Sequence, residues 1–429
     1  MDVILKYGNE QIALKIPQTN IERIIRPWQE SADTDNEAVI RQALTNSDAE
    51  NFKQKVQRKR ICVLIDDGTR NEPFEDTFGE LFKLLRTCSS VQFLICTGTH
   101  DADTDENNSI KTQIEIAARK AGIANFQIST HDCDTDRFIN AGCTSRDTEV
   151  LYNEIAETAD LFLVLSDLKV HYFSGYSNPI KNLLPGICAF KTTEQNHSLA
   201  LDENSTFGRH PWHLDKNRTT NPVAEDQLEG MRLIVKDRPV FALITITTSG
   251  KINWAGFGPV QNVTAKAFNI ADEKNTHTVK PTDKLIISPG GLPNDISLYI
   301  AQRALELSKN AVNDGGEILF LAACPDGVGE KKTIENFYNR LTAPIDEVLE
   351  SISGDYKLFS HKPYKFAQLI KRLRRIWMYS QIPADIIEAA HLFPAEDPQK
   401  VVDDWLAENP ETKITIVEGA NKIALYAKA

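Results

Sequence analysis

The chain has 429 residues and a formal net charge of −12 at neutral pH. A single hydrophobic core rarely grows beyond about 250–300 residues, so this length predicts two domains. Hydrophobic residues make up 41% of the chain and charged residues 25%, which excludes a mainly disordered or a fibrous protein.

The acidic balance and the N-terminus narrow the class of protein further. An excess of acidic residues argues against a nucleic-acid partner. Residues 1–6 lack the basic and apolar regions of a secretory signal. The sequence contains no run of about 18 apolar residues, the length that a membrane-spanning helix needs. The seven cysteines have irregular spacings and no CxxC pair, which is typical of buried thiols in a reducing compartment. We therefore expect a cytoplasmic protein without a membrane partner.

In chain order, two alternating segments come first, Asp2–Tyr7 and Gln11–Ile16, and the turn residues between them predict a β-hairpin. Residues 20–59 are polar and have a helical pattern. Short apolar runs that predict buried strands follow at Ile61–Ile65, Val91–Cys96, Leu161–Leu165, Val240–Ile246, Ile286–Ile287, Ile318–Ala322 and Ile414–Val417. Helices are predicted between several of them, at Asp76–Leu85, Ser109–Ala121 and Thr148–Glu157.

Buried strands that alternate with helices predict an α/β fold with largely parallel sheets. The polar segment Ala271–Lys284 contains a proline and no apolar periodicity, and we interpret it as an interdomain linker. The sequence therefore predicts two α/β domains, at residues 1–275 and 276–429, with the active site in the cleft between them.

Polar residues and glycines follow the ends of the predicted strands in both halves. In open α/β sheets, ligands bind outside the carboxyl ends of the strands, so these turns are candidate site residues. The alternative is that each one only forms a turn or caps a helix. The turns in question are Asp66–Arg70, Cys96–His100, Ser166–His171, Ser288–Gly291 and Cys324–Gly329.

The segment His171–Gly186 reads HYFSGYSNPIKNLLPG and predicts a long irregular loop. Its Lys181 lies between Ile180 and two leucines. A lysine that is desolvated by such neighbours can serve as a nucleophile or an attachment point. Alternatively, Lys181 lies at the surface and its stem covers the leucines.

Four histidines lie in the middle of the chain, and imidazole serves both as a metal ligand and as an acid/base group at neutral pH. The pair His210 and His213 could chelate a metal, although the proline between them argues against a helix face. Two other functions stay open: a zinc hydrolase that uses His171, His197 and an aspartate, and a non-catalytic binding protein. The four histidines are His171, His197, His210 and His213.

Taken together, these motifs resemble the nickel-pincer lactate racemase family and its 2-hydroxyacid racemase and epimerase relatives. The run His171, Lys181, His197 is the most specific part of the resemblance. The matching motifs, in the family's order, are DDGTR (Asp66–Arg70), GTH (Gly98–His100), HYFSGYSNPIKNLLPG, Asn196-His197-Ser198, Asn221-Pro222, GGLPNDISLY (Gly290–Tyr299) and AACPDGVG (Ala322–Gly329).

The resemblance implies a specific cofactor, the nickel pincer nucleotide. This is a pyridinium-3-thioamide-5-thiocarboxylic acid mononucleotide that carries nickel. Lys181 matches the lysine that attaches it covalently, and His197 matches the histidine that completes the coordination of the nickel. Nitrogen and soft donors suit Ni(II). Other proteins would have to synthesise and load this cofactor.

The resemblance also implies the reaction and its acid/base groups. His100 and His171 match two histidines on opposite sides of a 2-hydroxyacid, which exchange the hydroxyl proton while hydride passes reversibly between C2 and the cofactor. Two bases are needed because the two enantiomers present their hydroxyl groups to different sides. Asp67 and Arg70 match the DxxR pair of that family, in which the planar guanidinium group of the arginine can bind a carboxylate or a phosphate through two hydrogen bonds.

The chain departs from the lactate racemase pattern after the motif GGLPND. Ile300 and Arg303 occupy the positions of a glutamine and a lysine near the substrate or anion site, and we place Tyr299 at the same site. An apolar residue in place of the amide favours a substrate larger than lactate, either another 2-hydroxyacid or a sugar acid. The family's C-terminal active-site tryptophan has no clear counterpart, and Trp377 is a nearby candidate.

Overall fold

A computed structural model describes residues 1–28, 35–70 and 72–428, except for the side chain of Arg70. The chain divides into two compact units. We call the described residues between 29 and 271 the central unit. The terminal unit combines Met1–Trp28 with Asp272–Ala429.

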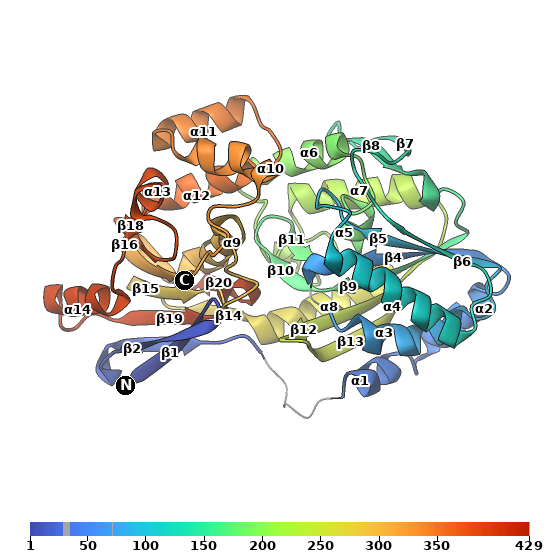
Figure 1. Cartoon of the computed structure of the whole chain (residues 1–429), viewed down its shortest axis with the longest axis horizontal. Helices are drawn as coiled ribbons and strands as arrows, with labels where there is room; N and C mark the ends of the chain where they lie inside the picture. The colour runs from blue at the N-terminus through green and yellow to red at the C-terminus, as the bar shows by residue number, and fades with distance from the viewer. Residues whose placement is uncertain (29–34, 71, 429) are drawn as a thin grey trace. The chain divides into compact units, whose positions relative to one another are not determined.

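The central unit has an α/β fold, and its strands and helices are labelled in Figure 1. Its strands are β4 (Arg60–Asp66), β5 (Ser90–Cys96), β6 (Phe126–Thr130), β7 (Phe138–Cys143), β8 (Glu149–Asn153), β9 (Leu161–Asp167), β10 (Lys169–His171), β11 (Gly175–Ser177), β12 (Val240–Thr248) and β13 (Lys251–Pro259). Its helices are α1 (Asn36–Ala43), α2 (Ser47–Lys55), α3 (Phe74–Leu81), α4 (Asp105–Ala121), α5 (Pro179–Leu183), α6 (Phe190–Ser198), α7 (Pro222–Val235) and α8 (Val260–Asn275).

Six of these strands form one sheet in the order β13-β12-β9-β4-β5-β6, in which only the β12–β13 pair is antiparallel. Ile61, Val63 and Ile65 point into the core that α1 to α4 cover. Leu64 is equally buried although it alternates with them, so both faces of β4 are covered. This is why parallel strands appear in the sequence as continuous apolar runs.

The terminal unit contains a second large sheet, with the order β18-β17-β16-β15-β19-β3, in which all five pairs are parallel. Two further pairs, β1-β2 and β14-β20, form small sheets of their own. Its strands are β1 (Asp2–Tyr7), β2 (Glu10–Lys15), β3 (Ile21–Ile25), β14 (Thr276–Val279), β15 (Thr282–Ser288), β16 (Val312–Leu321), β17 (Arg375–Tyr379), β18 (Phe393–Pro394), β19 (Ile414–Glu418) and β20 (Ala424–Ala427). Its helices are α9 (Leu298–Ser308), α10 (Lys331–Ile334), α11 (Ile345–Gly354), α12 (His361–Arg372), α13 (Ala384–Ala389) and α14 (Pro398–Glu408).

Successive side chains of β15 enter two different cores. Leu285 and Ile287 pack with residues of α9, α12 and α13, whereas Ile286 packs with the β1–β2 hairpin and α14. The alternation follows from the two-residue period of a strand. The predicted hairpin at the N-terminus is therefore confirmed, and it covers one face of the second sheet.

The predicted domain boundary near residue 275 lies close to the division at Ala271 and Asp272, but the assignment of the first residues to the N-terminal domain differs from the structure. Residues 1–28 belong to the terminal unit, because β3 pairs with β19 and the hairpin packs on β15 and β16. The segment Ala271–Lys284 is not a linker, since it contains the end of α8, all of β14 and the start of β15.

Two predicted helices are also wrong in part. Residues 149–153 form the strand β8 rather than a helix, and a short 3-10 turn at Glu154–Ala156 follows it. Residues 21–25 are a strand as well, so within the described residues the helical stretch predicted for residues 20–59 is confirmed for α1 and α2 alone; residues 29–34 of that prediction lie outside the described residues. Among the described residues, no helix is long and apolar enough to cross a membrane.

Candidate functional site

A buried aspartate orients an exposed histidine at the carboxyl edge of the central sheet. Asp67 follows β4 and His100 lies in the loop after β5, and the ends of these two strands are in register. Oδ2 of Asp67 lies 2.6 Å from Nδ1 of His100, and the side chains are 3% and 50% exposed respectively. Because Nδ1 donates to the carboxylate, Nε2 of a neutral His100 is left as the proton acceptor.

The turn that carries Asp67 is held by helix α4. A Cβ atom on Gly68 would lie 2.3 Å from Cβ of Glu106, so only glycine fits there. The buried Asn107 accepts a hydrogen bond from the Gly68 N–H at 2.9 Å and donates to the carbonyl groups of Asp101 and Ala102. The amide of Asn107 therefore fixes both the Asp67 turn and the loop that follows His100.

The acidic stretch after His100 has a structural explanation. The Thr104 side chain caps the N-terminus of α4, and Asp105 and Glu106 lie in its first turn. Acidic residues are favoured there because they complement the positive end of the helix dipole.

His171 and Lys181 are in direct contact. His171 ends β10, which forms a short hairpin with β11, and Nζ of Lys181 lies 3.2 Å from its Nε2 atom. The same Nζ donates to Oγ of the buried Ser174 at 3.2 Å, and the Ser174 N–H donates to Nδ1 of His171 at 3.3 Å. The hairpin therefore holds the predicted attachment lysine against a predicted acid/base histidine.

Lys181 is carried by α5, a helix of five residues. Asn178 caps this helix and Pro179 occupies its first position, where the missing N–H costs nothing. Asn182 donates to Oδ1 of Asp66 at 2.8 Å, while Oδ2 of Asp66 accepts the N–H of Asp167 at 3.0 Å. The last residue of β4 thus anchors the helix next to the end of β9.

Phe173 lies between His171, Lys181 and His197. Its ring centroid is 4.5 Å from that of His171, 5.1 Å from that of His197 and 5.4 Å from Nζ of Lys181. The structure therefore brings the three residues of the most specific sequence motif together around one aromatic ring. Burial lowers the pKa of His197 to about 3, so its imidazole is neutral at physiological pH.

These donors fit a covalently attached nickel cofactor. Lys181 offers a primary amine for attachment, and the neutral imidazole of His197 offers a nitrogen lone pair, the form in which histidine binds Ni(II). Among the described residues, the one group of three potential metal ligands within mutual reach is Asp132, Cys133 and Asp134, which does not include His171 or His197. A three-ligand zinc site built on these two histidines therefore has no support in the described part of the chain.

The sheet order places the two predicted acid/base histidines on either side of β4. His100 follows β5 and His171 follows β9, and both strands pair with β4. Neighbouring strands lie about 4.8 Å apart, so the two loops leave the same edge of the sheet within roughly 10 Å of each other. The loops also touch, because the Gly98 N–H donates to the carbonyl of Gly186 at 3.1 Å.

Other predicted site residues lie apart from this cluster. Tyr299 and Arg303 belong to α9 of the terminal unit, so their place in the same site stays a prediction. The side chain of Arg70 lies outside the described residues. Trp377 donates its indole N–H to Glu317 at 2.8 Å, near the amino end of the second sheet's strands, which is a structural role.

His210 and His213 are buried and shape a loop. Nδ1 of His210 accepts the N–H of Trp212 at 3.0 Å, and Nδ1 of His213 accepts the N–H of Asp215 at 2.9 Å. Burial and the neighbouring His213 lower the pKa of His210 to about 3. The turn formed by these bonds gives both histidines a structural role.

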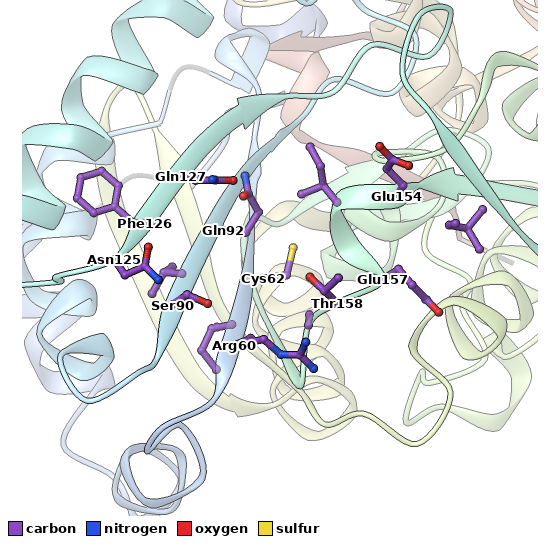
Figure 2. Close-up of a pocket in the computed structure, with 15 residues that line it drawn as sticks. Arg60, Cys62, Ser90, Gln92, Asn125, Phe126, Gln127, Glu154, Glu157 and Thr158 are labelled. Atoms are coloured by element: carbon purple, nitrogen blue, oxygen red, sulfur yellow. The ribbon is translucent and has the colours of Figure 1, made fainter.

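A pocket of about 600 Å³ elsewhere in the central unit is not this site, and its lining residues are drawn in Figure 2. It is lined by Arg60, Ser90 and Asn125, at or just before the first residues of β4, β5 and β6. These are the amino ends of the strands, whereas His100 and His171 follow carboxyl ends. The cavity therefore lies at the opposite edge of the sheet.

Sequence reasoning missed several residues of the site. Asn107, Ser174 and Asn182 are buried polar residues that hold the loops in place, and Phe173 is the ring shared by the cluster. Phe173, Ser174 and Asn182 lie in the HYFSGYSNPIKNLLPG motif, but the sequence did not single them out within it. The role of Asn107 had no local signal, because the segment around it is uniformly polar.

Comparisons with known proteins agree with the motifs. The lactate racemase N-terminal domain matches residues 7–208, and the lactate racemase C-terminal domain matches residues 277–421. The lactate racemase of Thermoanaerobacterium thermosaccharolyticum is 27% identical over 346 residues, which span 79% of this chain and 77% of that protein. The lactate racemase of Lactiplantibacillus plantarum is 23% identical over 372 residues, or 84% of this chain and 83% of that protein.

Solved structures show the same fold. The lactate racemase apoprotein of T. thermosaccharolyticum matches with a TM-score of 0.85 and 21% identity, covering 99% of this chain and 100% of that one. A protein from Thermotoga maritima matches with a TM-score of 0.66 and 13% identity, over 94% of this chain and 100% of its own. At these identities the likeness concerns the fold alone.

Proposed function

The chain belongs to the lactate racemase family, and on that premise we propose that it is a racemase or epimerase that inverts C2 of a 2-hydroxyacid. As an enzyme of the lactate racemase type it is an isomerase. The observation that carries the proposal is the site itself: the Asp67–His100 pair and the His171–Lys181 pair follow strands on either side of β4.

The two histidines would move the hydroxyl proton. In one direction Nε2 of His100 accepts it, and the Asp67 carboxylate stabilises the imidazolium that results. In the other direction His171 plays the corresponding part for the opposite enantiomer. A carboxylate-bound imidazole on one side and a lysine-bound imidazole on the other give the two faces of the substrate different proton carriers.

The nickel pincer nucleotide would be attached at Lys181, with His197 as the protein ligand of the nickel. When bound, it would supply the hydride acceptor that this chain's own side chains lack. The fit of Lys181 and His197 around Phe173 supports this assignment. Cofactor-biosynthesis proteins of the cell would have to load it.

We infer that the preferred substrate is larger than lactate. Ile300 is 38% exposed on α9 and offers apolar surface, and Arg303 provides a cation for the substrate carboxylate. Close by, Nζ of the buried Lys362 lies 3.6 Å from the ring centroid of Tyr299, and burial together with Arg303 lowers the pKa of Lys362 to about 7. At neutral pH Lys362 would therefore add only a partial positive charge to that of Arg303.

The test is a chiral screen of 2-hydroxyacids and sugar acids with cofactor-loaded enzyme. The substrate carries deuterium at C2 and the reaction runs in ordinary water. Hydride transfer returns the deuterium to C2, so the inverted product should keep its label, whereas abstraction of the C2 hydrogen as a proton would exchange it. Loss of the label, or inversion by a Lys181→Ala variant that carries no added mass, would contradict the proposal.

A further inference from the structure

The contacts of Lys181 in the cofactor-free chain identify its protonation state. Nζ lies 3.2 Å from Nε2 of His171 and 3.2 Å from Oγ of Ser174. The Ser174 hydroxyl donates to the carbonyl of Tyr176 at 3.4 Å, so its oxygen accepts from Lys181. The nitrogen of Lys181 has three directions for hydrogen bonds besides its bond to Cε. One of them points to the hydroxyl oxygen of Ser174 and one to the imidazole of His171.

The direction of the hydrogen bond between Lys181 and His171 follows from the other side of the imidazole ring. The Ser174 N–H donates to Nδ1 of His171 at 3.3 Å, so Nδ1 carries no proton. A neutral imidazole carries one proton, which must then be on Nε2. Nε2–H is a donor, and Nζ of Lys181 can accept its hydrogen bond only with a lone pair. An ammonium group has three donors and no lone pair, so it does not fit this arrangement.

We propose that His171 and Ser174 hold Lys181 as a neutral, nucleophilic amine before the cofactor arrives. His171 then has two successive roles, first as a positioning residue for covalent attachment and later as a proton carrier in turnover. The inference deepens the proposed function, because it assumes that Lys181 is the attachment residue. A neutral amine is the reactive form of lysine.

The other titratable groups around α5 have partners of their own. His197 is neutral because burial lowers its pKa. Helix α5 packs against β4, β9 and α7, and the carboxylates at the facing positions are bound: Asp66 by Asn182, Asp167 by Lys169 at 2.7 Å, and Asp226 by Asn196 at 2.8 Å. Phe173 favours the ammonium form through its ring face, by an effect smaller than a lost hydrogen bond to a charged group.

The experiment is competitive labelling of the cofactor-free chain with a trace of acetic anhydride, read by peptide mass spectrometry at a series of pH values. The unprotonated amine attacks the anhydride carbonyl, the N–C bond forms and acetate leaves with the proton from nitrogen. If Lys181 is held neutral, it should titrate at or below about pH 7, more than three units below the ordinary lysine pKa of about 10.4, so its unprotonated fraction near neutral pH is roughly a thousandfold larger than that of an ordinary lysine. Lys191, an exposed lysine in the same sample, controls for the amount of reagent; Glu149 binds it at 2.6 Å and raises its pKa, so the titration of Lys181 is compared with the ordinary lysine value and not with that of Lys191.

Two variants separate the proposed cause from a general effect of burial. His171→Phe keeps a ring next to Phe173 but removes the N–H donor, so the titration midpoint of Lys181 should rise by about one unit or more, with about tenfold lower reactivity near neutral pH. Ser174→Ala removes an acceptor that both forms of the amine can use, so the midpoint should not rise. Unchanged labelling of Lys191 and an unchanged melting temperature show that each variant is folded.

The labelling results test the inference separately from the proposed function. An ordinary titration of Lys181 in the unmodified chain, or the same low midpoint in His171→Phe, would overturn the inference. Failure of the proposed function is a separate result: a chain that racemises no 2-hydroxyacid, or whose adduct lies at another residue, would leave the labelling of Lys181 unchanged. Conversely, an adduct at Lys181 with an ordinary titration would keep the function and reject the role of His171.

Discussion

Two consecutive carboxylates support two different parts of the site at the scale of single residues. Asp67 binds Nδ1 of His100, whereas Asp66 binds Asn182 of the helix that carries Lys181. One Asp-Asp pair therefore contacts both the imidazole of His100 and the helix α5 that carries Lys181.

Asp67→Asn should lower kcat of the loaded enzyme by about 10²–10⁴-fold, the range that general acid–base groups contribute. The amide cannot stabilise an imidazolium, and it can turn its NH₂ group toward the ring and so favour the wrong tautomer of His100. Chiral assay of the initial rate measures the effect. The control is Thr69→Val, which removes only a hydroxyl that donates to the other carboxylate oxygen at 2.6 Å. Equal losses in the two variants would contradict a specific role of the carboxylate.

Ile300→Gln should shift substrate preference toward lactate. Restoring an amide removes apolar surface that favours a larger side chain, an effect worth about 1–3 kcal/mol, or roughly 10-fold or more in relative kcat/KM. The measurement compares kcat/KM for lactate and for longer 2-hydroxyacids in the two proteins. Ile300→Leu is the matched control, since it keeps the apolar surface. If lactate is already the best substrate of the unmodified enzyme, the role assigned to Ile300 is wrong.

At the scale of elements, the β10–β11 hairpin is shaped by a backbone contact that only glycine permits. Gly175 has φ of +77°, and a Cβ atom there would lie 1.8 Å from the carbonyl oxygen of Arg209. The loop that contains His210 is therefore packed directly on the turn that positions His171. Local strain at this turn would be transmitted to His171 and to Lys181.

Gly175→Ala should lower the free energy of unfolding by at least about 3 kcal/mol, because a backbone oxygen cannot rotate away from the new methyl group. Gly122→Ala is the control: Gly122 has the same φ of +77° but nothing within 4 Å of the Cβ position. That variant should lose only the backbone cost, about 1–2 kcal/mol. Denaturant unfolding of both variants checks the difference, and equal losses would mean that the close contact has no energetic weight.

At the scale of the whole molecule, each unit has a hydrophobic core of its own. The terminal unit also contains a buried glutamate at the amino end of its sheet. Glu317 is 2% exposed and accepts hydrogen bonds from the indole N–H groups of Trp377 and Trp405, at 2.8 and 3.0 Å, with Nζ of Lys284 at 3.2 Å. Burial by itself raises the pKa of Glu317, but the two indoles and Lys284 outweigh it and lower the pKa overall.

Glu317→Gln should make the terminal unit less stable at neutral pH and less sensitive to acid. A carboxyl whose pKa is lowered by folding contributes stability above its unfolded pKa of about 4.3, and that contribution is lost as the pH falls through the lower folded value. Hydrogen exchange at neutral pH and near pH 4 should therefore show a smaller acid effect in β15 and β16 of the variant. Exchange in β4 and β9 of the central unit is the internal control. An equal acid effect in both proteins would exclude this contribution.

The sequence by itself determined the fold class and singled out the candidate residues for the chemistry. Buried parallel strands need apolar side chains on both faces, so Ile61–Ile65 and Leu161–Leu165 were recognisable without coordinates. The motif with His171, Lys181 and His197 was recognisable because its residue types and spacing are specific. The starts of helices α5 and α7 depend on adjacent residues, because the capping asparagine and the first helical proline follow each other in Asn178-Pro179 and Asn221-Pro222. Such a signal can be recognised in the sequence without coordinates.

Only the tertiary structure decided which units and which partners these residues have. The N-terminal hairpin joins the C-terminal sheet because β3 finds its partner in β19, almost 400 residues later in the chain, and no local pattern encodes such a pairing. The residues of β8 pair with β7 instead of forming a helix, since strand pairing and burial override a weak helical pattern. Likewise, the bonds of Asp66 to Asn182, and of Asn107 to Gly68, join residues that are distant in sequence. Their geometry exists only once the strands have packed into a sheet, and for that reason the sequence singled out candidate reactive residues but not residues such as Asn107 that hold the loops in place.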